Sequence, residues 1–193
     1  QLFKFSSRNP EAVKQHTIVD NLTESEKHYF LGGDPAFGNF DGLLNNIDGL
    51  QMHTGKRKNI PELNVWGISD KELFLEANGI IRQKEKPFFA YIQTSGNHRP
   101  YDRTMSKKDT DFVKLKVPDE ALKKYGFESI DEYNSFRYFD YCVRRFMESA
   151  QKEKYFHNTI FIFVGDHGLA GDASAMYPPV WTEQRLTDEH VPL

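Results

Sequence analysis

The sequence predicts an α/β fold in which a mainly parallel sheet is flanked by helices. Short apolar runs rich in aromatic and β-branched residues alternate with segments of helical periodicity along the 193 residues, which is typical of βα units. Strands are expected at 28–33, 88–94 and 159–164, with a helix before each of the last two. A further strand begins at 189–193, so we expect the fold to be incomplete at its C-terminal end.

Helices are expected in four segments, which are 10–22, 40–46, 70–83 and 130–152. Pro10 stands near the first turn of the first segment, and Ser69 is the expected N-cap of the third. The longest segment carries a broad aromatic stripe, which is typical of a helix packed on a core. Residues 95–124 are polar and are expected to form a long loop, which in a compact domain favours a binding role or disorder.

The composition excludes several classes of protein. Hydrophobic residues make up 38% of the chain and aromatic residues 14%, which is enough for the core of one domain. The net charge of -3 gives no reason to expect nucleic acid as a partner. No apolar run approaches the roughly 20 residues of a membrane helix. Cys142 is the single cysteine, so an internal disulfide is impossible, and its apolar surroundings favour a buried thiol.

Two side chains that can bind a metal ion follow the strand expected at 159–164. Asp166 and His167 stand between two glycines in the sequence GDHG. Successive side chains of a strand point to opposite faces, whereas the flanking glycines let both side chains turn toward one ligand. A carboxylate and an imidazole at the C-terminal edge of a parallel sheet suit a divalent metal ion.

A second candidate pair follows the strand expected at 88–94, in the sequence TSGNHRPYD. If both strands lie in one parallel sheet, His98 and Arg99 face the same crevice as the metal-binding pair. A metal ion and a histidine can neutralise a phosphate or sulfate ester, and an arginine can bind two of its oxygens. The alternatives are a surface ion pair for Arg99 and a loop histidine without a chemical role for His98.

Three sequence segments resemble a known family. YFLGGDPAFGNFDGLL, PFFAYIQTSGNHRPYD and NTIFIFVGDHG occur in this order, with a helix before each of the last two strands. Together they resemble the lipoteichoic acid synthase branch, the phosphoglycerol transferases, of the sulfatase and alkaline phosphatase superfamily. The resemblance extends over residues 29–193. It implies that residues 1–193 are part of one sulfatase-like catalytic domain with an alkaline phosphatase-like fold.

The resemblance also implies a reaction and a cofactor. Members of this branch transfer glycerol phosphate from phosphatidylglycerol, or a related phospholipid, to a glycan or polyglycerol phosphate acceptor, through a phosphothreonine and one Mn²⁺ or Mg²⁺ ion. By motif match, Asp166 and His167 correspond to two metal ligands, and His98 corresponds to the catalytic, substrate-binding histidine. The implied location is the extracytoplasmic face of the bacterial cell membrane, with anchoring by membrane helices that are absent from this sequence.

The sequence departs from the pattern of this branch in three respects. The family's nucleophilic threonine and an acidic metal ligand precede the segment YFLGG, and nothing before Tyr29 resembles either. We therefore expect the upstream part of the domain to be missing, and this chain alone to bind metal weakly and to be inactive. Residues 34–41 lack the tryptophan and arginine with which the polymerising synthases bind glycerol phosphate. Trp66 and Trp181 are expected to be packing residues, with part of a pocket wall as the alternative for Trp181, which follows Pro178 and Pro179.

Two alternative functions stay open. A sulfatase or a phosphoethanolamine transferase shares the fold and the pair of aspartate and histidine; the nucleophile of a sulfatase is a cysteine or serine converted to formylglycine. A non-catalytic binding module would keep the fold and half of the site. Alanine in place of Asp166 and His167 separates these classes, because an enzyme loses turnover, whereas a binding module keeps its affinity unless a metal ion holds the ligand.

Overall fold

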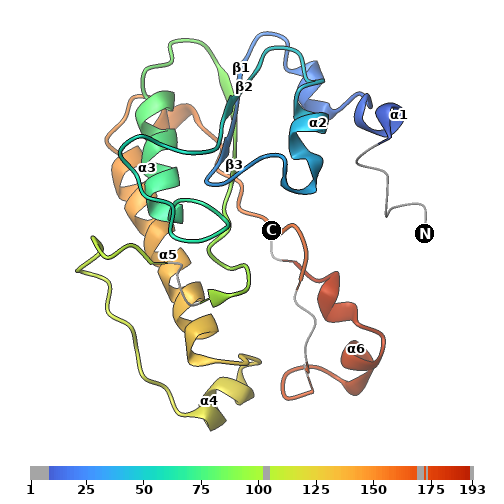
Figure 1. The fold of residues 1–193 in the computed structure, drawn as a ribbon, viewed down its shortest axis with the longest axis vertical. Helices are drawn as coiled ribbons and strands as arrows, with labels where there is room; N and C mark the ends of the chain where they lie inside the picture. Colours follow the sequence, from blue (N-terminus) through green and yellow to red (C-terminus); the bar gives the residue numbers. More distant parts are fainter. Residues whose placement is uncertain (1–8, 102–104, 169–171, 173, 192–193) are drawn as a thin grey trace.

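Three parallel strands form the centre of the fold. The computed structural model describes residues 9–101, 105–168, 172 and 174–191. The strands are β1 (Glu26–Leu31), β2 (Leu50–His53) and β3 (Phe88–Gln93). They are hydrogen-bonded in the order β2-β1-β3 (Figure 1). Both pairings are parallel, and Tyr29 lies opposite Met52 on one side and Tyr91 on the other. This arrangement confirms the expected parallel sheet flanked by helices.

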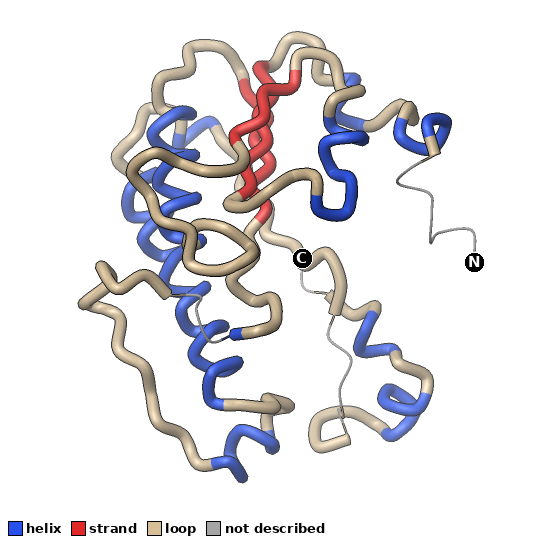
Figure 2. The backbone as a smooth tube through the Cα atoms, in the orientation of Figure 1, coloured by secondary structure: helices blue, strands red, loops and turns tan. Residues whose placement is uncertain are grey.

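Helical segments lie on both sides of this sheet (Figures 1 and 2). In chain order they are α1 (Pro10–Val13), η2 (Ile18–Asn21), η3 (Phe37–Asn39), α2 (Phe40–Leu44), α3 (Asp70–Ile81), α4 (Asp119–Lys124), α5 (Ile130–Ala150), η5 (Phe156–Asn158), α6 (Pro179–Glu183) and η6 (Leu186–Asp188). The long helices α3 and α5 pack on each other on one side of the sheet, and α1 and α2 lie on the other side (Figure 1).

Serine caps fix the starts of the two long helices. The hydroxyl of Ser69 accepts the backbone N–H of Glu72 at the start of α3, and the hydroxyl of Ser129 accepts that of Glu132 at the start of α5. Such a cap satisfies one of the N–H groups that the first turn of a helix leaves without a partner. The helices expected at 70–83 and 130–152 are confirmed, each ending two residues early.

Two clusters of buried side chains hold the helices and the sheet together. The first joins the sheet to α3 and contains Phe30, Ile68, Leu73, Ala77 and Ile81. The second joins α3 to α5 and contains Phe74, Tyr138, Tyr141, Cys142 and Phe146. The aromatic stripe of α5 is thus core, as predicted. Burial raises the pKa of the Cys142 thiol, which agrees with the expected unreactive cysteine.

The helix expected at 10–22 is wrong as a continuous element. α1 ends at Val13, and η2 begins only at Ile18. The break has a local cause, because the carboxylate of Asp20 accepts both the backbone N–H of Thr17 at 2.6 Å and its hydroxyl at 2.7 Å. Side chains that bond the nearby backbone in this way compete with the helix and start a new turn.

The strand expected at 159–164 is also wrong as an element of the sheet. Its backbone forms no ladder with any other described strand, and Ile160 and Ile162 are 87% and 71% exposed. Phe161 packs on Phe146 of α5 and on Phe156. The segment therefore has the side chains of a strand but no hydrogen-bonding partner. Residues 189–191 are not a strand either, and 192–193 lie outside the described residues.

Sequence periodicity misses several short elements, among them β2 and α4. β2 has four residues, and its pairing with β1 is supported by Lys27, whose ammonium group donates to the carbonyl of Asp48 at 3.0 Å. α4 lies inside the expected loop 95–124 and begins directly after Pro118. Elements this short owe their stability to tertiary contacts, so their own periodicity is too weak to predict them.

Two histidines face each other between β1 and β2. His28 Nδ1 and His53 Nε2 are 3.1 Å apart, and the side chain of His28 is fully buried. The carboxylate of Glu26 lies 3.7 Å from the other ring nitrogen of His28, and Lys84 pairs with the same carboxylate. Burial lowers the pKa of both histidines. The two rings are therefore expected to be neutral and to share one hydrogen bond.

Acidification is expected to weaken the fold through this pair. A histidine whose pKa is lowered by folding binds its proton more readily in the unfolded chain, so stability falls as the pH drops below the ordinary value of about 6.5. His53→Gln removes one titrating ring and keeps a hydrogen-bonding partner for His28. Between about pH 7 and pH 5, we expect the variant to lose less free energy of unfolding than the unchanged protein, as measured by urea denaturation.

The comparison with the variant is necessary because Asp70 acts in the opposite direction. Burial raises the pKa of Asp70 to about 6. The folded protein therefore holds a proton there that the unfolded chain releases, so this group adds stability as the pH falls from about 6 toward 4. That contribution cancels in the difference between the two proteins. An equal loss in both would contradict a role for the histidine pair.

Candidate functional site

The carboxyl ends of β1 and β3 lie at the same edge of the sheet, as parallel strands require. Segment 66–70 lies beside the end of β1, where the N–H of Ile68 donates to the carbonyl of Gly32 at 3.2 Å. Gly67 has a φ of 102°, and a Cβ there would overlap the carbonyl of Gly32. Glycine at position 67 therefore allows segment 66–70 to approach the strand end closely.

Asp70 anchors the loop that follows β3. Its buried carboxylate accepts the backbone N–H groups of Ser95 and Gly96, each at 3.0 Å. A Cβ at position 96 would overlap this carboxylate, so the close approach requires glycine. Ser135 of α5 donates its hydroxyl to the carbonyl of Gly96. The two long helices thus fix the backbone just before His98.

Replacing Asp70 with alanine is expected to destabilise the protein by about 2–4 kcal/mol, because the partly buried N–H groups of Ser95 and Gly96 lose their acceptor. Asp131 is the matched control, since it lies in the first turn of α5 but is about half exposed and 3.8 Å from Lys114. Asp131→Ala is expected to change stability by less than about 0.5 kcal/mol. Urea denaturation near pH 7 measures both, and equal effects would contradict the anchoring role.

His98 is exposed, and its orientation is set by its own loop. Its Nδ1 lies 2.7 Å from the carbonyl oxygen of Arg99. A carbonyl can only accept, so Nδ1 carries the hydrogen and Nε2 of the neutral ring is left as a hydrogen-bond acceptor. The indole ring of Trp66 lies against the imidazole, with 3.8 Å between ring centres. The same indole donates its N–H to the Arg99 carbonyl at 3.1 Å.

Arg99 takes part in an ion pair. Its guanidinium group lies 2.9 Å from the carboxylate of Glu128, and both side chains are more than half exposed. The surface ion pair that the sequence left open is therefore present in the structure. An exposed pair of this kind is weak, so a phosphate could take the place of the carboxylate. Substrate binding by Arg99 stays a prediction.

Asp166 and His167 lie together on the surface. Oδ2 of Asp166 is 3.8 Å from Nε2 of His167, and the two side chains are 77% and 64% exposed. His167 Nδ1 lies 2.7 Å from the carbonyl oxygen of Gly168. That hydrogen bond and, secondly, the charge of Asp166 raise the pKa of His167. The backbone of Gly168 is itself held by the carbonyl of Asp188, at 2.8 Å.

The donor atoms of this pair fit a divalent metal ion. Because Nδ1 of His167 donates to a carbonyl, Nε2 carries the lone pair that a metal ion binds, on the side of the ring that faces Asp166. Carboxylate oxygen and imidazole nitrogen are both ligands of Mn²⁺. Among the described residues, no group of three His, Cys, Asp or Glu side chains is arranged to hold a metal ion. Other ligands would have to complete the coordination.

The two candidate pairs do not touch each other in the described ranges. Among the described residues, no hydrogen bond or ion pair joins His98 or Arg99 to Asp166 or His167; each pair bonds within its own surroundings. Burial is the main cause of the raised pKa of Tyr91 in β3, and the charge of Asp166 is the second cause. Asp166 thus lies near the strand that His98 follows, and convergence of the two pairs on one ligand stays a prediction.

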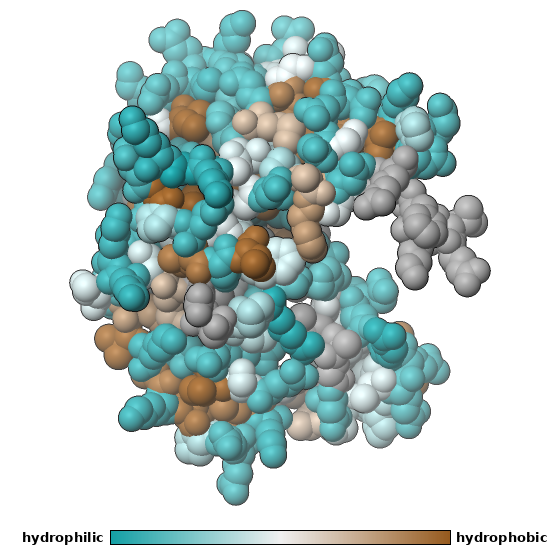
Figure 3. Space-filling model, in the orientation of Figure 1, coloured by the Kyte–Doolittle hydropathy of each residue, from teal (hydrophilic) through white to brown (hydrophobic). Residues whose placement is uncertain are grey.

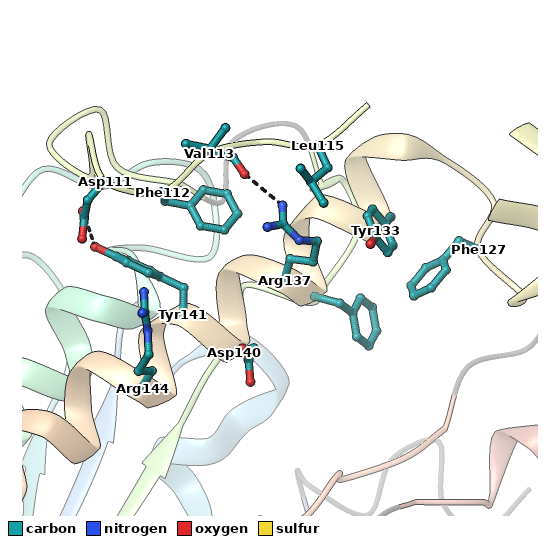
Figure 4. Close-up of a pocket in the computed structure, with 11 residues that line it drawn as sticks. Asp111, Phe112, Val113, Leu115, Phe127, Tyr133, Arg137, Asp140, Tyr141 and Arg144 are labelled. Atoms are coloured by element: carbon teal, nitrogen blue, oxygen red, sulfur yellow. Dashed lines mark hydrogen bonds between the residues drawn. The ribbon is translucent and has the colours of Figure 1, made fainter. Parts of the chain in front are cut away.

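A cavity of about 590 Å³ opens elsewhere, between segment 111–115 and α5 (Figure 4). Hydrophobic side chains gather over this part of α5 (Figure 3). Arg137 crosses the cavity, donates to the carbonyl of Val113 at 2.9 Å and stacks over Phe112. Arg144 lies over the ring of Tyr141. The four predicted site residues do not line this cavity, and its arginines are engaged in packing.

Sequence reasoning missed two residues of the site. Asp70 was visible as an acidic residue after the cap Ser69, but its bonds to a loop 25 residues away have no signal in a single sequence. Trp66 was expected only to pack. It does pack, yet its partner is His98. The nearest sequence signal is Gly67 beside it, since an isolated glycine before a helix indicates a close approach of the backbone.

Comparisons with known proteins identify the family to which this fold and site belong. The sequence pattern of the Sulfatase family matches residues 10–192. The chain belongs to the Sulfatase family. It is 24% identical over 140 residues to lipoteichoic acid synthase 1 of Bacillus subtilis (strain 168), a match that covers 71% of this chain and 20% of the relative. It is also 24% identical over 169 residues to the uncharacterized sulfatase YdeN of Escherichia coli (strain K12), covering 84% of this chain and 28% of the relative.

Solved structures share the fold. The structure of LtaP, a lipoteichoic acid synthase of Listeria monocytogenes, matches with a TM-score of 0.66 at 16% identity, over 90% of this chain and 43% of that one. An alkaline phosphatase superfamily protein of Vibrio parahaemolyticus matches with a TM-score of 0.65 at 23% identity, over 94% of this chain and 43% of that one. The expected resemblance to the lipoteichoic acid synthase branch of this superfamily is confirmed.

The chain spans less than a third of the length of these curated relatives, at 20% of the first and 28% of the second. The match alone therefore does not assign the activity of the whole relatives to this chain. In the part of the chain that the structure describes, no helix is both long enough and apolar enough to cross a membrane.

Proposed function

We propose that this chain is part of the catalytic domain of a metal-dependent phosphoglycerol transferase or phosphodiesterase that acts on a phosphatidylglycerol-type lipid. The observation that supports this function most strongly is that the imidazole rings of His98 and His167 make the same hydrogen bond. In each, Nδ1 donates to a backbone carbonyl 2.7 Å away, and Nε2 is directed away from that bond. In a Sulfatase-family fold, this gives one histidine for a metal ion and one for the phosphoryl group.

The residues have distinct proposed roles. Asp166 and His167 would hold the Mn²⁺ or Mg²⁺ ion, which, when bound, supplies positive charge to the phosphoryl oxygens. Nε2 of His98 accepts the proton of an attacking hydroxyl, or, once protonated, donates it to the diacylglycerol oxygen that leaves. When the substrate binds, Arg99 would leave its ion pair with Glu128 and bind the phosphoryl oxygens instead, because a guanidinium group binds phosphate by two parallel hydrogen bonds.

The acceptor, the nucleophile and the location are proposed by analogy with the relatives. Lipoteichoic acid synthase 1 is named for making lipoteichoic acid, and by analogy the acceptor would be a glycan or a polyglycerol phosphate. The nucleophilic threonine would come from outside this chain, since no residue before Tyr29 matches it. The proposed location is the extracytoplasmic face of a bacterial cell membrane, where both the lipid and such an acceptor are accessible.

A panel of donors tests this function. The full-length protein is incubated with Mn²⁺ and with vesicles of phosphatidylglycerol or phosphatidylethanolamine, and released diacylglycerol is measured. An aryl sulfate is the third donor, and its hydrolysis is measured as released phenol. We expect release from phosphatidylglycerol at least about tenfold faster than from phosphatidylethanolamine. Preference for phosphatidylethanolamine or hydrolysis of the sulfate would replace the proposal by the matching alternative. Binding of lipid without turnover of any donor would indicate a binding module.

A further inference from the structure

Trp66 contacts the His98 loop at three points. Its indole ring lies on the imidazole with 3.8 Å between ring centres, and its indole N–H donates to the Arg99 carbonyl at 3.1 Å. Its own backbone carbonyl accepts the hydroxyl of Ser95 at 3.4 Å. One side chain thus contacts both the ring that is proposed to react and the carbonyl that orients this ring. A tryptophan that only filled space in a core would need neither contact.

The Arg99 carbonyl is the point at which these contacts meet. It accepts the N–H of the Trp66 indole and the Nδ1–H of His98, which uses both of its lone pairs. Fixing this carbonyl fixes which nitrogen of His98 carries the hydrogen. The indole face also restricts rotation of the imidazole, which is otherwise an exposed side chain free to change rotamer.

Trp66 is itself held in place on several sides. Its backbone N–H donates to the side chain of Asn64 at 2.8 Å. The ring of Phe37 meets the indole edge to face, with 4.9 Å between ring centres. Gly67 lets the backbone turn back against β1, and Asp70, four residues further on, holds the start of the His98 loop. The indole is therefore a pre-arranged wall beside His98.

We propose that Trp66 is a positioning residue that sets the rotamer and the tautomer of His98 for phosphoryl transfer. The inference rests on the proposed function, because it assumes that His98 acts on the phosphoryl group. A group held in reactive geometry before the substrate arrives reduces the entropy lost in the transition state, and small misplacements reduce the rate by about 10²-fold. Trp66 therefore affects turnover through His98, without touching the substrate.

Two substitutions separate the two contacts. Trp66→Phe keeps a ring beside His98 and removes the indole N–H, whereas Trp66→Ala removes both. In the full-length protein we expect kcat for diacylglycerol release to fall about 10²-fold in Trp66→Ala and by a smaller factor in Trp66→Phe, with KM changed less than about threefold. Trp181→Phe is the control, because Trp181 stacks on Tyr177 and meets the ring of His190, and no ring contact within the described part of the chain joins it to His98.

A second measurement does not depend on turnover. The ¹⁵N resonances of His98 in ¹⁵N-histidine-labelled full-length protein report which ring nitrogen carries the hydrogen. We expect a single Nδ1–H tautomer in the unchanged protein and in Trp181→Phe, and a mixture in Trp66→Ala. An unchanged tautomer together with an unchanged kcat in Trp66→Ala would overturn the inference. If the unchanged protein turns over no donor, the proposed function fails, and the tautomer comparison alone decides the role of Trp66.

Discussion

Alanine in place of Asp166 or His167 is expected to lower kcat for diacylglycerol release by at least about 10³-fold, the cost of removing a group that stabilises charge in the transition state. The fold should be unaffected, since both side chains are largely exposed at 77% and 64%. Their loss therefore removes chemistry and not packing. The measurement is steady-state release from phosphatidylglycerol vesicles with Mn²⁺ in excess, together with thermal unfolding of each variant.

Asp172 supplies the matched control for this prediction. It is an exposed carboxylate a few residues away, and it accepts the backbone N–H of Ser174 at 2.9 Å. Hydrogen bonds from Ser174 and Thr182 lower its pKa. Asp172→Ala is expected to keep the activity of the unchanged protein. Mn²⁺ affinity, measured by calorimetry, should fall in Asp166→Ala and not in Asp172→Ala. An Asp166→Ala protein that keeps both affinity and turnover would remove this residue from the metal site.

His98→Ala is expected to have the second largest effect, a loss of about 10²–10⁴-fold in kcat, which is the range for a residue that transfers a proton in the transition state. His98→Gln can still form a hydrogen bond but cannot carry a proton at this position. We therefore expect Gln to restore lipid binding, seen in KM, without restoring kcat. Steady-state kinetics with phosphatidylglycerol vesicles separates the two parameters.

His157→Gln is the control for the histidine substitutions. His157 belongs to η5, is exposed and contacts the ring of Phe156, far along the chain from the His98 loop. It should retain full activity. Equal kcat values for His98→Gln and the unchanged protein would assign His98 to binding and leave proton transfer to another group.

The sequence was sufficient to predict the elements whose signals are local. The helices capped by Ser69 and Ser129 have an N-cap residue and a periodic apolar stripe in the sequence. In the structure, each serine accepts a backbone N–H of the first turn, and each stripe is buried. The strands of β1 and β3 were predicted from apolar runs that are buried by α3. In each case the physical cause acts within one or two turns of the residues that show it.

The errors arise where long-range contacts decide. Segment 159–164 has strong β propensity, yet propensity does not provide a partner strand, and Ile160 stays exposed. The helix expected at 10–22 is interrupted after Val13, and Asp20 bonds the backbone of Thr17 where the second helical turn starts. At the candidate site, motif spacing indicated the two histidines and the two partners beside them. It could not indicate the anchoring carboxylate of Asp70, because the N–H groups that donate to this carboxylate come from another loop.

The most direct test of a phosphoglycerol transferase is the covalent intermediate. The full-length protein is incubated with phosphatidylglycerol and Mn²⁺ without an acceptor, denatured, and its intact mass and modified peptide are determined. The account predicts a mass increase of one glycerol phosphate group on a threonine, and no increase in Asp166→Ala. Release of diacylglycerol without any adduct, or a nucleophile identified as formylglycine, would contradict it.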